Sequence, residues 1–151
     1  MKLNNIYAHR GCWADEAEHN SINSILNAIK SGFSIETDVR DFIGKLIISH
    51  DPAREFNLSM QDLVLETNEI FSKGKNKIAL NIKSDGLSSL MLYDESINKF
   101  IKKFCYVFDM SIPDLMQYRE KSFNYLIRYS EHEDNFSLYD HSSGIWFDSF
   151  D

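Results

Sequence analysis

The fold of this protein is decided by one stretch of its sequence, FSIETDVRDFIGKLIISHD at residues 33–51. Residues 33–39 have the pattern of a strand, and they carry two acidic side chains two positions apart, Glu36 and Asp38. A turn at 41–44 follows, with Gly44 at its end, and the apolar run 46–48 comes directly after it. This order predicts a β-hairpin that turns at Gly44.

Short apolar runs alternate with longer amphipathic segments along the rest of the chain. Further strands are predicted at residues 6–8, 78–82, 106–108, 125–127 and 145–147, and helices at 22–29, 59–70, 87–102 and 112–118. Asn20 or Ser21 is expected to cap the first helix, and Ser59 the second. Apolar strands separated by helices indicate an α/β protein with a parallel sheet covered by helices. The pattern is compatible with a doubly wound open sheet and with a (β/α) barrel.

The composition limits the classes of function. A chain of 151 residues is expected to form one domain with a substantial core, because domains usually span ~100–200 residues. Sixteen Lys and Arg against 23 Asp and Glu give a net charge of −7, which argues against nucleic-acid binding through phosphates. The longest apolar run, 104–108, is far shorter than the ~20 residues of a membrane span. The start of the chain shows no signal-peptide pattern, so a cytoplasmic location is predicted.

Polar residues recur where the predicted strands end. Barrel enzymes place their chemistry at the carboxyl ends of several strands, so this recurrence predicts a functional rim. The residues at these ends are His9, Arg10, Glu36, Asp38, His50, Asp51, Asn81, Lys83, Asp109, Arg128 and Asp148.

Three pairs of residues within this set predict, in turn, cation binding, acid–base catalysis and anion binding. Glu36 and Asp38 leave the same face of a strand, and two converging carboxylates suit a hard cation such as Mg²⁺ or Ca²⁺. His9 and His50 titrate near neutral pH, so one can act as a base and the other as an acid. The cations Arg10 and Lys83 can bind an anionic oxygen. Solvated strand ends and ion pairs among these residues are the alternative interpretation.

Four short sequence motifs, in their order and spacing along the chain, resemble those of a known family. They are His9-Arg10-Gly11, Asn20-Ser21, IETDV at 35–39 and GKLIISHD at 44–51. Together they resemble the glycerophosphodiester phosphodiesterase family, strongly over residues 6–51. Leu80-Asn81-Ile82-Lys83 is similar to the third-strand motif of that family.

The resemblance implies a TIM-type (β/α) barrel that hydrolyses glycerophosphodiester-like substrates with a bound divalent cation, Mg²⁺ or Ca²⁺. A substrate hydroxyl next to the phosphodiester would attack phosphorus, and water would then open the cyclic phosphate. The implied roles are acid–base catalysis by His9 and His50, metal binding by Glu36, Asp38 and Asn81, and phosphoryl contacts by Arg10 and Lys83.

Three features depart from the family pattern. Asn81 stands where the family usually has a carboxylate, which predicts weaker cation binding. EHNS at 18–21 replaces the usual Pro-Glu-Asn-Thr. A (β/α)₈ barrel needs ~200 residues or more, so residues 1–151 are expected to form a single, C-terminally incomplete barrel domain with about six of the eight strands.

Two functions are therefore weighed. The first is a metal-dependent phosphodiester hydrolase in lipid metabolism, acting on a small phosphodiester. The second is an inactive remnant that keeps only a phosphate-binding rim. A phospholipase D-like activity on lipids ranks below both, since the sequence offers no apolar docking helix. Self-association through open sheet edges is a further expectation.

Overall fold

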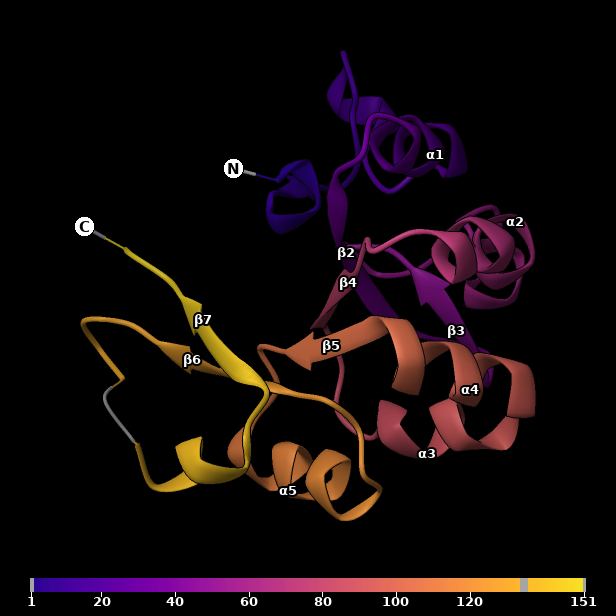
Figure 1. Ribbon diagram of the computed structural model, residues 1–151. Coiled ribbons are helices and arrows are strands. Elements are labelled where there is room, and N and C mark those ends of the chain that lie inside the picture. Colours follow the sequence, from indigo (N-terminus) through magenta and orange to yellow (C-terminus); the bar gives the residue numbers. More distant parts are fainter. Residues whose placement is uncertain (1, 134–135, 151) are drawn as a thin grey trace.

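Seven strands and five α-helices alternate in the computed structural model, which describes residues 2–133 and 136–150 (Figure 1). The strands are β1 (Tyr7–His9), β2 (Ser34–Phe42), β3 (Lys45–Ile48), β4 (Ile78–Ile82), β5 (Cys105–Phe108), β6 (Leu126–Tyr129) and β7 (Gly144–Phe147). The helices are α1 (Ile22–Lys30), α2 (Met60–Lys73), α3 (Leu87–Tyr93), α4 (Glu95–Phe104) and α5 (Ile112–Glu120), with short 3₁₀ turns η1 (Leu3–Asn5), η2 (Glu16–Glu18) and η3 (Phe136–His141).

Six of the strands run parallel in the order of the chain. One sheet has the order β1-β2-β4-β5, and β3 pairs antiparallel with the far end of β2 to make the hairpin predicted at Gly44. β6 and β7 form a second parallel pair, which a bridge between Val107 and Tyr125 links to β5. Figure 1 shows the helices on the outer side of this curved array of strands.

The barrel is not closed in the part of the chain that the structure describes. β1 pairs only with β2, and β7 pairs only with β6. The α/β class, the parallel sheet and the incomplete barrel with six parallel strands are therefore confirmed.

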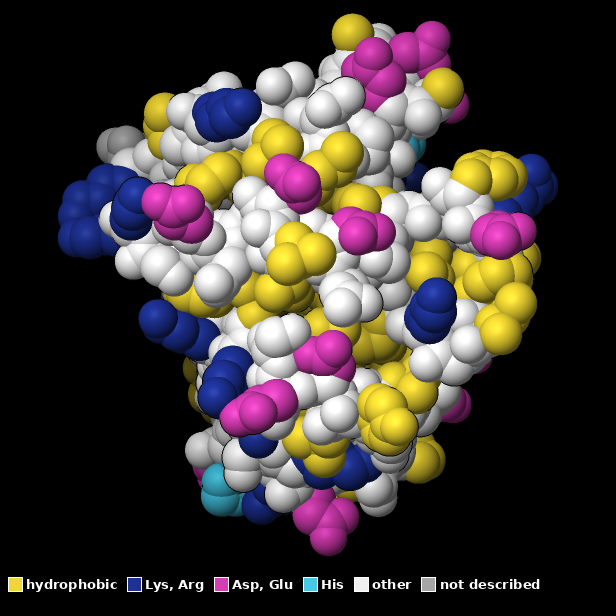
Figure 2. Space-filling model, turned by 90° about the vertical axis from the view of Figure 1, so that its right-hand side faces the viewer, with side chains coloured by type: hydrophobic (Ala, Val, Ile, Leu, Met, Phe, Trp, Pro, Cys, Tyr) yellow, Lys and Arg dark blue, Asp and Glu magenta, His cyan; other side chains and the backbone are white. Residues whose placement is uncertain are grey.

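Burial on both faces explains the apolar strands. Every residue of β2 from Ser34 to Val39 is buried, because helices cover one face of the strand and the interior of the array lies on the other. On the outer face, shown in Figure 2, acidic and basic side chains are interspersed with hydrophobic ones.

Serine caps fix where three helices begin. Ser21, Ser59 and Ser111 each accept a hydrogen bond from a backbone N–H three residues later. Ser21, and not Asn20, is thus the cap of α1. Such caps satisfy N–H groups that have no partner within the helix.

The predicted helix at 87–102 is wrong in one respect, because the segment forms two helices. Asp94 has an extended backbone, with φ −99° and ψ 120°, and its carboxylate accepts hydrogen bonds from the N–H groups of Ser96 and Ile97. Asp94 therefore ends α3 and caps α4.

None of the described helices is long and apolar enough to cross a membrane.

The open edge at β7 leads to a prediction about association. Ile145 and Phe147 alternate with the inward-facing Trp146 and are 44% and 68% exposed, so an apolar face adjoins an unpaired edge. We expect the 151-residue polypeptide to self-associate with rising concentration, because such edges pair with other chains. Sedimentation analysis should show a concentration-dependent mass that Phe147→Lys reduces.

Phe56→Lys is the matched control, since Phe56 is 80% exposed in the loop after β3 and does not belong to β7. A monomer at all concentrations, or an equal response of both variants, would contradict the expectation.

Candidate active site

The predicted site residues lie together at the carboxyl end of the parallel sheet. His9 ends β1 and is paired in register with Glu36 of β2, while Asp38 of β2 is paired with Asn81 of β4. Residues paired in register on parallel strands project from the same face of the sheet. Arg10 follows β1, His50 follows β3, and Lys83 follows β4, so the loops after three strands complete the group.

Asp38 is fully buried and is surrounded by donors. Its Oδ2 accepts a hydrogen bond from Asn20 Nδ2 at 3.0 Å and lies 2.9 Å from Arg10 Nε. Its Oδ1 lies 3.5 Å from Lys83 Nζ. Two cations therefore compensate this carboxylate, which keeps a buried charge tolerable.

Glu36 lies in a less favourable environment. It is 4% exposed, and the Nε2 of the His9 imidazole lies 3.8 Å from Glu36 Oε2. Burial, followed by repulsion from Asp38, raises the pKa of Glu36 from 4.5 to about 7. Glu36 can therefore take up or release a proton near neutral pH.

Three oxygens in this group are buried and have no hydrogen-bond partner. They are Glu36 Oε2, Asp38 Oδ1 and Asn81 Oδ1. Buried polar atoms are normally satisfied, so these three oxygens on neighbouring strands leave room for a further partner, with Lys83 Nζ 3.5 Å from Asp38 Oδ1. Carboxylate and amide oxygens are the donors that Mg²⁺ and Ca²⁺ take, so these residues fit a hard cation. Residues 2–133 and 136–150 contain no group of three or more His, Cys, Asp and Glu that could hold a metal ion, so the third ligand would be an amide.

The two histidines differ in their surroundings. The side chain of His9 is 62% exposed, and burial, followed by the charge of Arg10, lowers its pKa below 6.5. A lowered pKa keeps His9 neutral at pH 7, which is the form that accepts a proton. His50 is 46% exposed, and its Nδ1 lies 3.0 Å from Asp51 Oδ1. A carboxylate at one ring nitrogen holds the orientation of the imidazole and leaves Nε2 for a proton transfer.

Asn20 is a site residue that the sequence analysis did not assign. Its Oδ1 accepts a hydrogen bond from Thr37 Oγ1 at 2.7 Å while its Nδ2 donates to Asp38, and its φ is +58°. Its place in the second motif block was the available signal, but only the structure shows that it holds Asp38.

A cavity of about 830 Å³ opens beside the site residues Arg10, Asn20 and His50. It is lined by Arg10, His19, Asn20, His50, Asp51 and Arg54, among others. Trp13 borders the site as well, because its indole donates a hydrogen bond to the His9 carbonyl and its ring packs 4.1 Å from that of His19. The cavity gives a small ligand access to His50 and Arg10.

Comparisons with known proteins agree on the fold. No protein-family model matches the chain, and no curated protein matches it in sequence. It resembles the crystal structure of a glycerophosphodiester phosphodiesterase from Parabacteroides distasonis, with a TM-score of 0.72 and 14% identity over 94% of this chain and 72% of that one. A protein from Galdieria sulphuraria assigned to the same activity gives a TM-score of 0.73 and 15% identity, over 94% and 74%.

The fold and the strand ends thus define an α/β protein of the incomplete TIM-barrel type. More specifically, its fold is that of the glycerophosphodiester phosphodiesterases, which is the fold that the four sequence blocks predict.

Proposed function

We propose that this protein hydrolyses glycerophosphodiester-like substrates at the carboxyl end of its sheet. The observation that carries the proposal is the set of buried oxygens without a hydrogen-bond partner on Glu36, Asp38 and Asn81, beside His9 and the cations Arg10 and Lys83. A divalent cation, Mg²⁺ or Ca²⁺, held by these oxygens would offset negative charge on the phosphoryl group. The fold and the sequence blocks support the same activity.

The residues of the chain would divide the reaction between them. Neutral His9 takes the proton from the substrate hydroxyl as its oxygen attacks phosphorus and the P–O bond to the leaving alcohol breaks. His50 gives a proton to the leaving alkoxide, and in the second step the roles reverse as water opens the cyclic phosphate. Arg10 and Lys83 stabilise the charge that develops on the phosphoryl oxygens. A cytoplasmic location and a role in lipid metabolism stay predictions.

One observation favours the second candidate function, a phosphate-binding rim without turnover. Asp38 is already paired with Arg10 and Lys83, and its neighbour Asn81 brings no charge, so cation binding has to compete with existing ion pairs. An assay of alcohol release from glycerophosphocholine with Mg²⁺ or Ca²⁺ decides between the two. Cation-dependent release that His9→Ala abolishes supports the hydrolase, and phosphate binding without release supports the rim alone.

The third ligand predicts the strength of cation binding. Calorimetry with Mg²⁺ and Ca²⁺ is expected to give dissociation constants on the order of millimolar, since two carboxylates and one amide leave most positions to water. Asn81→Asp should tighten binding by ~10-fold, because it adds a charge in register with Asp38.

Asn98→Asp is the matched control, because Asn98 on α4 also has a buried and unpartnered Oδ1 but lies outside the site. Tight binding that survives Glu36→Ala would place the cation elsewhere.

A further inference from the structure

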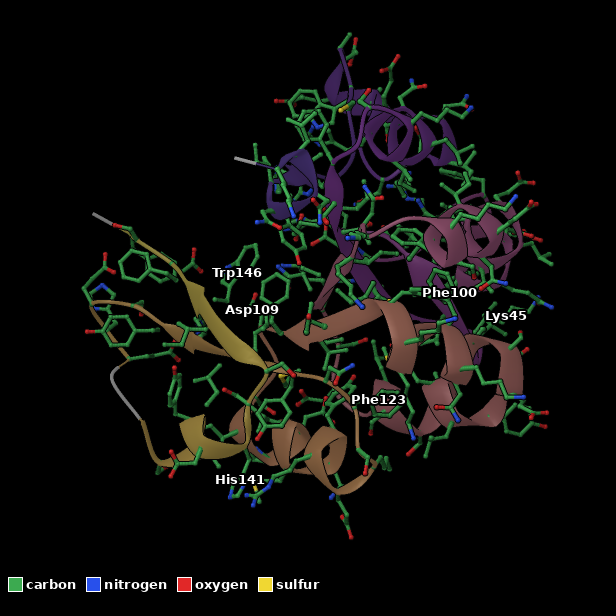
Figure 3. The ribbon with its side chains drawn as sticks, viewed as in Figure 1. Lys45, Phe100, Asp109, Phe123, His141 and Trp146 are labelled. Carbon is green, nitrogen blue, oxygen red and sulfur yellow. The ribbon has the colours of Figure 1, made fainter. Side chains whose placement is uncertain are left out.

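Charged residues also stand at the carboxyl ends of β5 and β6: Asp109 directly follows β5, and Arg128 is the penultimate residue of β6. The proposed reaction assigns no role to either residue. Asp109 Oδ1 accepts a hydrogen bond from Arg128 Nη1, and Asp109 Oδ2 lies 3.7 Å from Lys83 Nζ. Each oxygen of this carboxylate thus faces a different cation. Figure 3 shows Asp109 near Trp146 of β7, whose ring stacks on Phe108 with centroids 4.1 Å apart.

Arg128 is itself held on its other side. Its Nε lies 2.5 Å from Glu133 Oε2, and its Nη2 donates to Glu133 Oε1 at 3.0 Å. A bidentate pair of this kind fixes the plane of a guanidinium group. Arg128 therefore presents Nη1 to Asp109 from a fixed position.

The backbone at Asp109 is unusual in the same way as elsewhere in the site. Its φ is +68°, a value that side chains other than glycine rarely adopt. Of the five non-glycine residues with positive φ in the described part of the chain, Arg10 and Asn20 also lie at the site and contact Asp38, whereas Ile43 and Ser122 lie in turns elsewhere. Strained residues of this kind cluster at functional sites, where surrounding contacts hold them in place.

Lys83 lies between two carboxylates and is locked to neither. Its Nζ is 3.5 Å from Asp38 and 3.7 Å from Asp109, whereas a direct charge-assisted hydrogen bond is about 2.7–2.9 Å long. A lysine side chain is long and flexible, so a single partner on β2 would leave its position poorly defined. The second carboxylate on β5 limits the ammonium to the space between the two strands.

We propose that Asp109 is a positioning residue, which together with the Arg128–Glu133 pair holds Lys83 Nζ beside Asp38. Its importance for turnover rests on the proposed function, whereas the placement of Lys83 does not. The site then extends from β1 to β6, and the turn after β6 takes part in it through Glu133. The alternative is that the Asp109–Arg128 pair only joins β6 to β5.

The placement of Lys83 can be tested without a ligand. Amine-reactive labelling followed by mass spectrometry should show Lys83 labelled at least ~3-fold faster in Asp109→Asn than in the unchanged protein, because an ion-pair partner is lost. Asp109→Glu should restore slow labelling. Lys99, which pairs with Glu95 on α4, is the internal control and should not change. Unchanged labelling of Lys83 in a folded Asp109→Asn variant would overturn the proposal.

The role in turnover needs a second measurement, with glycerophosphocholine as the probe. Asp109→Asn should lower kcat/KM by about tenfold, Asp109→Glu should recover most of the loss, and Arg128→Gln should add less than twofold in the Asp109→Asn background. If the losses of kcat/KM in the Asp109→Asn and Arg128→Gln variants were additive and Asp109→Glu recovered nothing, the Asp109–Arg128 pair would be merely structural. If the unchanged protein shows no turnover but the labelling responds as expected, the proposed function fails while the placement of Lys83 stands.

Discussion

Replacing either His9 or His50 by alanine is expected to lower the turnover of a glycerophosphodiester by ~100-fold or more. Each histidine handles a proton that must move for a P–O bond to form or break, whereas His19, which lines the same cavity as His50, has no role in the proposed reaction. His9 lies 3.8 Å from the buried Glu36, and His50 is oriented by Asp51. Steady-state alcohol release with excess Mg²⁺ or Ca²⁺ measures the effect.

His132→Ala and His141→Ala are the matched controls and should keep near-full activity. Both residues are exposed in the segment between β6 and β7, and Figure 3 shows His141 away from Asp109. If His9→Ala or His50→Ala retained near-full turnover, the acid–base assignment would be wrong.

The second large effect concerns stability, and it follows from Glu36. Its pKa is about 7 in the folded protein, whereas an unfolded glutamate has a pKa near 4.5. The protonated form is therefore favoured on folding, and its contribution is complete below pH 4.5 and is lost as the pH rises to about 7. Glu36→Gln removes this pH-dependent loss of stability, because the glutamine amide stays neutral at every pH. Above pH 7 the variant should be more stable by roughly 3 kcal/mol, which corresponds to roughly 6–12 °C in Tm.

Thermal melts at pH 4.5 and pH 8 measure this difference. The two proteins should melt at similar temperatures at pH 4.5 and diverge at pH 8. Glu69→Gln on α2 is the control, because Glu69 pairs with Lys73 at the surface and should change little. A cation at Glu36 should stabilise the unchanged protein at pH 8 more than the Gln variant, because the amide lacks the negative charge. A variant that is less stable at both pH values would contradict the explanation.

Local sequence determined most of the elements. Residues 78–82 form β4 as predicted, the hairpin turns at Gly44, and Ser21 and Ser59 cap their helices, because periodicity and capping act over a few residues. The break at Asp94 was missed, since the apolar spacing continues across it and a single side-chain cap outweighs that spacing. The alternation of strands and helices predicts the parallel sheet. It does not predict the curvature of the sheet or which strands form its open edges.

The same division holds for the site. The sequence by itself placed His9, Glu36, Asp38, His50 and Lys83 at one end of the sheet, because parallel strands carry their carboxyl ends to one edge. Only the tertiary structure decided which charges meet: that Asp38 takes Arg10, Lys83 and Asn20 as partners, that Glu36 keeps a raised pKa, and that Asp109 joins Lys83 to Arg128. Burial and Coulomb energy depend on distances between atoms, and those distances are set by strand pairing and loop conformation between residues far apart in the chain.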